Sequence, residues 1–227
     1  MLNRLTERIW VYPYEEARDR PNLGYVRGDR WSLAVDAGHS ADHLRGFYRE
    51  LEAAGLPLPA LTVLTHWHWD HTLAMHAVHG LCLAGEMTNR HLAAFRDRLA
   101  VEGTGFFFGL DERIRREYAD GKPVIVTLAD MTFAGEMSLD PGNCPVRVFR
   151  AEAPHTDDTT LIDVPGEGVL FLGDSTGASF PDRIMDLDLA GKLAETVRSA
   201  HPAICLEGHW TPLSPEEIIY DLLNGNG

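Results

Sequence analysis

The sequence has few cysteines for its length, and they do not form a pattern. Only three are present, Cys82, Cys144 and Cys205, and they are far apart and odd in number. This argues against a disulfide framework and for a reducing compartment. We therefore expect a cytoplasmic protein in which each cysteine is a small buried apolar residue.

Basic residues and long apolar runs are also scarce. Lys and Arg number 20 against 34 Asp and Glu, giving a formal net charge of −14. Nucleic-acid binding depends on a basic surface that contacts phosphates, so we expect no nucleic-acid partner. No stretch approaches the roughly 20 apolar residues of a membrane span. The first ten residues lack the apolar centre of a signal peptide, so we expect neither a leader nor a membrane partner.

What the sequence does contain is a regular alternation of strand and helix patterns. The 227 residues are 44% hydrophobic, which suits one domain, residues 1–227, with a sizeable core. Apolar periodicity and Gly/Pro boundaries predict both kinds of element. The predicted strands are 8–12, 24–27, 31–35, 61–64, 124–128, 131–133, 146–149, 159–164, 169–172 and 203–206. The predicted helices are 40–54, 86–99, 111–118, 186–200 and 215–223.

This order favours an α/β protein with stacked layers, in which a helical insert at about 86–122 interrupts the strands. The insert contains a tip, residues 103–108, that joins glycines to three adjacent phenylalanines. Exposed aromatic patches serve both substrate binding and association. The tip is therefore interpreted either as a lid over an apolar pocket or as a contact in a possible homodimer.

The segment Thr65-His-Trp-His-Trp-Asp-His71 carries the chemistry. His66 and His68 stand two apart where the chain leaves a predicted strand, so both side chains point the same way. Asp70 and His71 follow after the chain turns into a helix and can reach a neighbouring point. Three imidazoles and a carboxylate buried together are costly without a metal. The spacing therefore predicts ligands for two ions a few Å apart.

The pattern His66-x-His68-x-Asp70-His71 resembles the signature of the metallo-β-lactamase superfamily. Further segments resemble other parts of the family pattern in the same order along the chain. They are the Asp-x-Gly turn that supports the metal loop, the third-ligand loop, the strand that ends in a bridging Asp, and the last ligand. Here these are residues 35–38, 154–158, 171–175 and 207–209.

The resemblance implies an αββα sandwich of two mixed β-sheets flanked by helices, with the metal site along one edge. It also implies a ligand set. One ion would be held by His66, His68 and His155, the other by Asp70, His71 and His209, with Asp174 bridging both. Imidazole and carboxylate ligands suit two Zn²⁺ ions, with Fe or Mn as alternatives.

The implied function is hydrolysis of an ester, thioester, lactone or amide bond in a small molecule by a metal-bridging hydroxide. Asp70 would be the catalytic residue that orients the nucleophile or accepts its proton. The sequence departs from known members. β-Lactamases of the commonest kind have Cys where this chain has Asp174 and Lys where it has Gly177, and lactonases often have Tyr at the latter position. These differences argue against both assignments. Glyoxalase II-like thioesterases carry a helical domain after the last ligand, where only 18 residues follow His209.

Two alternatives remain open. A mononuclear-iron redox enzyme of the same superfamily, similar to persulfide dioxygenases, would need only the first site. A non-catalytic metal-binding regulator would be expected to lose ligands, and all seven positions are filled. Around the ligands, Thr65, Asp36 and Asp157 are candidates for orienting them. Three tryptophans stand next to ligands in the sequence: Trp67, Trp69 and Trp210. They either line the mouth of a substrate pocket or pack on the sheets.

Overall fold

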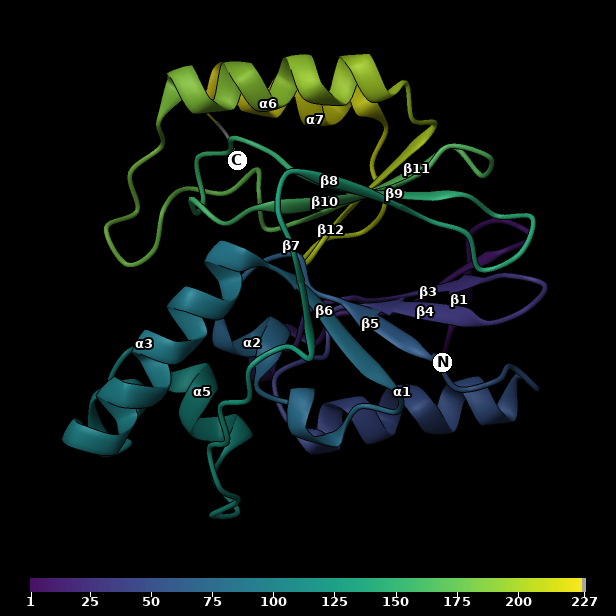
Figure 1. Ribbon diagram of the computed structural model, residues 1–227. Coiled ribbons are helices and arrows are strands. Elements are labelled where there is room, and N and C mark those ends of the chain that lie inside the picture. The colour runs from purple at the N-terminus through teal and green to yellow at the C-terminus, as the bar shows by residue number, and fades with distance from the viewer. Residues whose placement is uncertain (226–227) are drawn as a thin grey trace.

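Two β-sheets lie face to face at the centre of the computed structural model, which describes residues 1–225 (Figure 1). The first sheet has the order β1-β2-β3-β4-β5-β6-β7, antiparallel up to β4 and parallel from β4 to β7. The second has the order β12-β11-β10-β9-β8, and only β11 and β12 are parallel. Their bounds are β1 Asn3–Arg4, β2 Ile9–Tyr12, β3 Leu23–Arg27, β4 Ser32–Val35, β5 Leu61–Val63, β6 Leu81–Gly85, β7 Met131–Phe133, β8 Glu136–Leu139, β9 Val146–Arg150, β10 Thr160–Val164, β11 Val169–Gly173 and β12 Ile204–Glu207.

Helices cover the outer face of each sheet. Helix α1 (Ala41–Ala53) packs on the first sheet, and α6 (Leu187–Ala200) and α7 (Pro215–Asn224) pack on the second (Figure 1). The layers are helix, sheet, sheet and helix, so the predicted αββα sandwich of two mixed sheets is confirmed. Among residues 1–225, no helix combines the length and the apolar character needed to cross a membrane.

The strand sequences explain this layering. In β11, Val169 and Phe171 pack in the cluster between the sheets, whereas Leu170 and Leu172 pack against α6 and α7. Side chains alternate between the two faces of a strand, so an unbroken apolar run is what a strand covered on both faces requires. The three cysteines are buried and unpaired, as expected.

The stretch 86–122 connects β6 to its parallel neighbour β7 and contains three helices. They are α3 (Glu86–Glu102), α4 (Gly105–Phe108) and α5 (Glu112–Glu117). The expectation of an exposed aromatic tip is wrong for Phe107, whose side chain is fully buried. Phe107 lies in an aromatic cluster with Trp69, Phe95 and Tyr118. The tip is therefore part of a small core that joins the insert to the chain segment carrying the metal motif.

Four of the strand assignments differ from the structure, and among them the strands β1 and β8 were not predicted. Residues 124–128, predicted as a strand, have no regular secondary structure, although Val126 and Leu128 still pack against buried clusters. Conversely, β6 (Leu81–Gly85) was not predicted, because Leu-Cys-Leu-Ala-Gly lacks the β-branched and aromatic residues that mark strands. Packing between parallel neighbours, rather than local propensity, makes this segment a strand.

Candidate metal centre

Four separate segments deliver the predicted ligands to one edge of the sandwich. His66 and His68 follow β5, and the short helix α2 (Trp69–Thr72) carries the next two ligands. The remaining three lie just after strands or between them: in the β9–β10 loop, directly after β11, and after β12. In chain order the seven residues are His66, His68, Asp70, His71, His155, Asp174 and His209.

Three imidazoles meet in the first cluster. Nδ1 of His68 lies 3.1 Å from Nε2 of His66 and 2.9 Å from Nε2 of His155. One imidazole nitrogen carries at most one proton, so it cannot serve both neighbours as a donor. Ligand nitrogens around a tetrahedral Zn²⁺ at 2.0–2.1 Å lie roughly 3.3 Å apart. The spacing therefore fits a cation shared by all three rings.

The second cluster contains both carboxylates. Nε2 of His209 lies 2.8 Å from Oδ2 of Asp70, and Nε2 of His71 lies 3.3 Å from the same oxygen. Asp174 stands between the clusters, because its Oδ1 is 3.3 Å from Nε2 of His71 and its Oδ2 is 3.9 Å from Nε2 of His155. This is the placement that a carboxylate bridging two ions requires.

The polar atoms at this centre fit bound cations. Nε2 of His71 and Oδ1 of Asp174 are buried atoms that have no hydrogen-bond partner among the described residues. Such unpaired buried groups are costly. All the candidate ligand atoms are imidazole nitrogens or carboxylate oxygens, the set that zinc, iron and manganese accept. The residues present thus fit a two-cation site.

The two clusters differ in their affinity for protons. Burial lowers the pKa of His68 to about 3, assisted by the neighbouring His155 ring. Burial also lowers the pKa of His71, but the carboxylates of Asp70 and Asp174 outweigh it and raise this pKa well above its usual value. In the same way they raise the pKa of His209 to about 9. Burial thus disfavours a proton on His66 and His68, whereas the carboxylates of the second cluster favour protons or metal ions beside them.

Asp36 and Thr65 hold the ligands in orientation, as the sequence suggested. Oδ2 of Asp36 accepts a hydrogen bond from Nδ1 of His71 at 2.7 Å, and Oδ1 accepts one from the Thr65 amide, also at 2.7 Å. Oγ1 of Thr65 lies 3.0 Å from Nδ1 of His66. Nδ1 of His155 lies 2.9 Å from the carbonyl oxygen of Ala178. These bonds leave Nε2 of three rings directed at the centre.

Two glycines permit the close approach of β11 and β12 to the ligands. A Cβ on Gly173 would lie 2.6 Å from Oγ1 of Thr65, and the residue has a φ of +57°. A Cβ on Gly208 would lie 2.1 Å from Oδ1 of Asp174 and 2.9 Å from Cε1 of His71. Because neither position has room for a side chain, both glycines are needed to bring Asp174 and His209 to the centre.

Replacing Asp36 with Asn should weaken metal binding by roughly 10–100-fold, the usual effect of losing such a supporting residue. The carboxylate accepts bonds from His71 and from both the amide and the hydroxyl of Thr65. An amide has a single acceptor oxygen and cannot satisfy all of them. Asn tolerates the positive φ of 64° found here. Competition with a chromophoric chelator measures the loss.

The matched control is Asp163→Asn, another buried aspartate, which pairs with Arg147 in the second sheet. This variant should lose some stability but keep the metal affinity of the parent. Equal losses of affinity in both variants would show that Asp36 acts only through general stability.

Among residues 1–225, the side chains of the other candidates make no hydrogen bond to a candidate ligand, although the rings of Trp67 and Trp69 lie beside that of His68. Asp157 is largely exposed and pairs with Nε2 of His91 at 2.6 Å, so it joins the β9–β10 loop to α3. Trp69 is buried in the aromatic cluster and Trp67 is partly buried beside it. Trp210 alone is strongly exposed, at 57%, and it lines a cleft. Packing is thus the role of the first two tryptophans.

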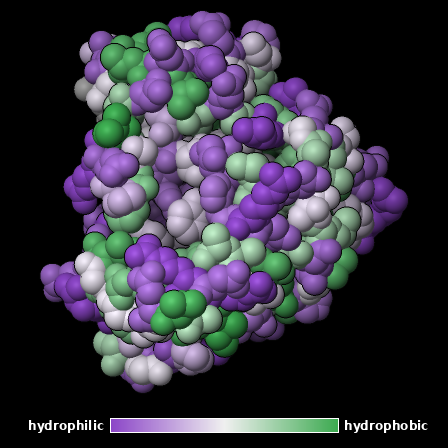
Figure 2. Space-filling view, turned by 60° about the vertical axis from the view of Figure 1, so that its left-hand side comes forward, coloured by the Kyte–Doolittle hydropathy of each residue, from purple (hydrophilic) through white to green (hydrophobic). Residues whose placement is uncertain are grey.

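A cleft of about 790 Å³ opens at the centre. His155, Asp174 and His209 contribute to it, and it extends to α7. Figure 2 shows that the face of the molecule turned toward the viewer is hollowed, with hydrophilic residues around much of the hollow. The cleft also contains residues that the sequence did not indicate: Thr176, Ala178, Glu207, Leu213, Glu216, Glu217, Ile218, Tyr220 and Asp221. Only the position of Glu207 beside His209 offered a signal.

Comparison with known proteins agrees with this fold. The family model described as the metallo-beta-lactamase superfamily matches residues 18–209. A metallo-beta-lactamase from Pontibacter korlensis is similar in structure, with a TM-score of 0.71 at 15% identity, covering 100% of this chain and 99% of that one. The DIM-1 metallo-beta-lactamase has a TM-score of 0.70 at 18% identity, covering 99% and 97%. No curated protein sequence matches. The match over residues 18–209 shows that the chain belongs to the metallo-β-lactamase superfamily.

Proposed function

We propose that this protein is a metal-dependent hydrolase that holds two Zn²⁺ ions and cleaves an ester, thioester, lactone or amide bond of a small molecule. The observation that supports this most directly is the position of Asp174, which lies between three imidazoles on one side and a carboxylate with two imidazoles on the other. One ion would be held by His66, His68 and His155. The other would be held by Asp70, His71 and His209.

The ions would polarise a carbonyl group and make water more acidic. The protein's own residues supply orientation and a proton acceptor. Burial raises the pKa of Asp70, but His71 and His209 outweigh it and hold this pKa well below its usual value. Asp70 is therefore a carboxylate at neutral pH that can orient water and accept its proton. Asp36 fixes the ring of His71 beside it.

The complete second cluster favours hydrolysis over single-iron redox chemistry. A mononuclear centre has no use for the second cluster, in which Asp70 and His209 lie beside His71. A regulator without catalysis has no use for a cleft of about 790 Å³ that opens on both clusters. These are the observations that rank the hydrolase first.

Metal content is the first test. Protein prepared with added zinc should bind close to two ions per chain, measured by mass spectrometry after gel filtration. Removing them with a chelator should abolish hydrolysis of a panel of aryl esters, thioesters and lactones, and re-addition of zinc should restore it. Saturation at one ion, with oxygen uptake in the presence of thiol substrates on iron-loaded protein, would replace the hydrolase proposal with the redox alternative.

A further inference from the structure

We propose that the substrate carries a cationic group, an ammonium or a guanidinium, which binds in the cleft between the metal centre and α7. This inference rests on the proposed hydrolase function and adds a substrate class to it. It follows from the charge of the cleft wall, its aromatic side chains and its continuity with the reacting centre.

The wall of the cleft is negatively charged and lacks compensating cations. Beyond the metal centre, four carboxylate side chains line it: Glu207, Glu216, Glu217 and Asp221. No Lys or Arg is among the described residues that line the cleft. Glu217 is occupied in capping α7 through Ser214. The other three take part in no ion pair among residues 1–225, so their charge is left for a ligand.

Glu207 is the carboxylate placed nearest the reaction. It is the last residue of β12, two positions before His209, and it accepts a hydrogen bond from the hydroxyl of Thr176. That bond fixes its carboxylate between the metal centre and α7. A substrate cation beside it would share the cleft with His155, Asp174 and His209.

Two aromatic side chains complete a site suited to a cation. Trp210 is 57% exposed and Tyr220 is 63% exposed, and both line the cleft. Exposed aromatic rings beside carboxylates are the surroundings in which ammonium and guanidinium groups are bound, because the ring face is electron-rich. An apolar floor from Leu213 and Ile218 accommodates a short alkyl chain.

The cleft leads to polar groups that still need a partner. Its inner end is formed by His155, Asp174 and His209, next to Nε2 of the fully buried His71, which has no hydrogen-bond partner among the described residues. At Gly177 no side chain projects into this space. Along the cleft wall beyond the metal centre, a substrate carboxylate would meet four carboxylates and no Lys or Arg, whereas a cationic group would meet opposite charge.

The test compares three 4-nitrophenyl esters on the zinc-loaded enzyme. One has a 4-trimethylammonio-butyryl chain, one has its neutral tert-butyl isostere, and one has a glutaryl chain that ends in a carboxylate. The cationic ester should have a kcat/KM roughly tenfold or more above the neutral one, and the glutaryl ester should be poorest. The preference should shrink at high salt, since screening weakens charge attraction.

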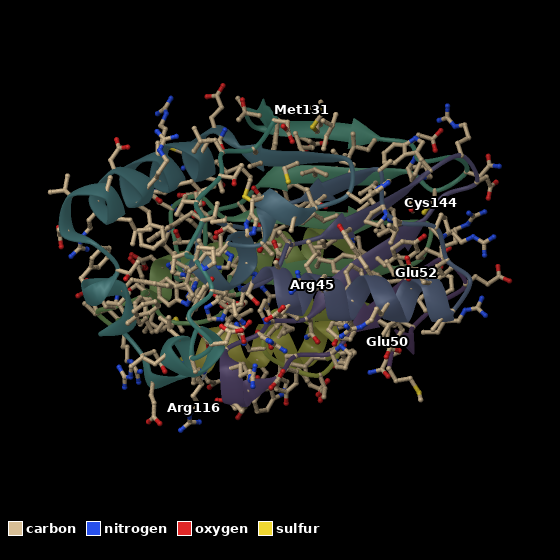
Figure 3. The ribbon with its side chains drawn as sticks, turned by 90° about the horizontal axis from the view of Figure 1, so that it is seen from below. Arg45, Glu50, Glu52, Arg116, Met131 and Cys144 are labelled. Carbon is tan, nitrogen blue, oxygen red and sulfur yellow. The ribbon has the colours of Figure 1, made fainter. Side chains whose placement is uncertain are left out.

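Variants identify the residues responsible. Asp221→Asn and Glu207→Gln should each reduce the preference for the cationic ester several-fold, through KM, and the double variant should remove most of it. Glu52→Gln is the control, because Glu52 is an exposed residue of α1 that forms no ion pair within residues 1–225. Figure 3 shows it at the opposite end of the molecule from Arg116 of the insert. It removes the same charge and should change nothing.

Two outcomes distinguish this inference from the proposed function. If the enzyme hydrolyses the esters but prefers the neutral or glutaryl one, or if the double variant keeps the cationic preference, the inference is wrong and the hydrolase stands. If no ester is hydrolysed, calorimetric binding of butyltrimethylammonium ion decides instead. Binding that the double variant loses supports the cation site without catalysis, and absence of binding overturns it.

Discussion

Replacing Asp174 with Ala is expected to lower kcat/KM by a factor on the order of 10³ or more while the fold survives. Oδ1 of Asp174 faces His71 and Oδ2 faces both His155 and His209. Without this carboxylate, two neighbouring cations would repel each other with no shared anion between them, and their separation would no longer be set. Three imidazoles would still form a site for one ion.

The measurement combines metal content with steady-state kinetics. Asp174→Ala should retain about one zinc per chain, held by His66, His68 and His155, and Asp174→Cys should recover part of the binding because thiolate is a zinc ligand. Asp182→Ala, an exposed aspartate in the following loop, is the matched control and should behave like the parent. Near-normal turnover with two bound ions in Asp174→Ala would falsify the bridging role.

The first four ligand positions could be predicted from a local pattern, whereas His155, Asp174 and His209 were implied by the resemblance to the family. His66, His68, Asp70 and His71 lie within six residues, and the alternation of a strand followed by a turn dictates where they point. Asp174 and His209 come directly after apolar runs that were predicted as strands, so the strand ends place them at the edge of the sheets. The role of Asp36 was suggested by its turn, and its bond to His71 supports it.

The cleft could not be predicted, because it depends on how α7 sits against the second sheet. Asp221 and Tyr220 are ordinary residues of an amphipathic helix in the sequence. Only the packing of Ile218 and Leu222, the buried residues of α7, against the second sheet and α6 brings them to the cleft. No spacing in the sequence links Glu207 to a helix that begins eight residues later. Long-range packing of this kind leaves no local signal.

The aromatic tip, residues 103–108, shows the opposite error. Its sequence pattern is distinctive, but the prediction that its phenylalanines are exposed was wrong for Phe107. Three adjacent phenylalanines between glycines look exposed when the surrounding helices are short and polar. In the structure Phe107 is fully buried and contacts Trp69, Phe95 and Tyr118 through edge-to-face rings. Trp69 begins α2, so the insert packs directly on the helix that carries Asp70 and His71.

Phe107→Ala should therefore destabilise the protein by about 3–5 kcal/mol, the usual cost of removing a fully buried phenylalanine. For a chain of this size the melting temperature should fall by roughly 6–20 °C. Metal affinity should fall as well, because the cavity removes support from Trp69 at the start of α2. Phe107→Leu, which keeps most of the volume, should lose much less, and Val101→Ala, at a position 86% exposed in α3, should lose almost nothing. Calorimetry and chelator competition measure both effects. If Phe107→Ala melts like the parent and binds zinc as tightly, the aromatic cluster does not couple the insert to the metal centre, and its role as a lid or a contact between subunits returns as the better explanation.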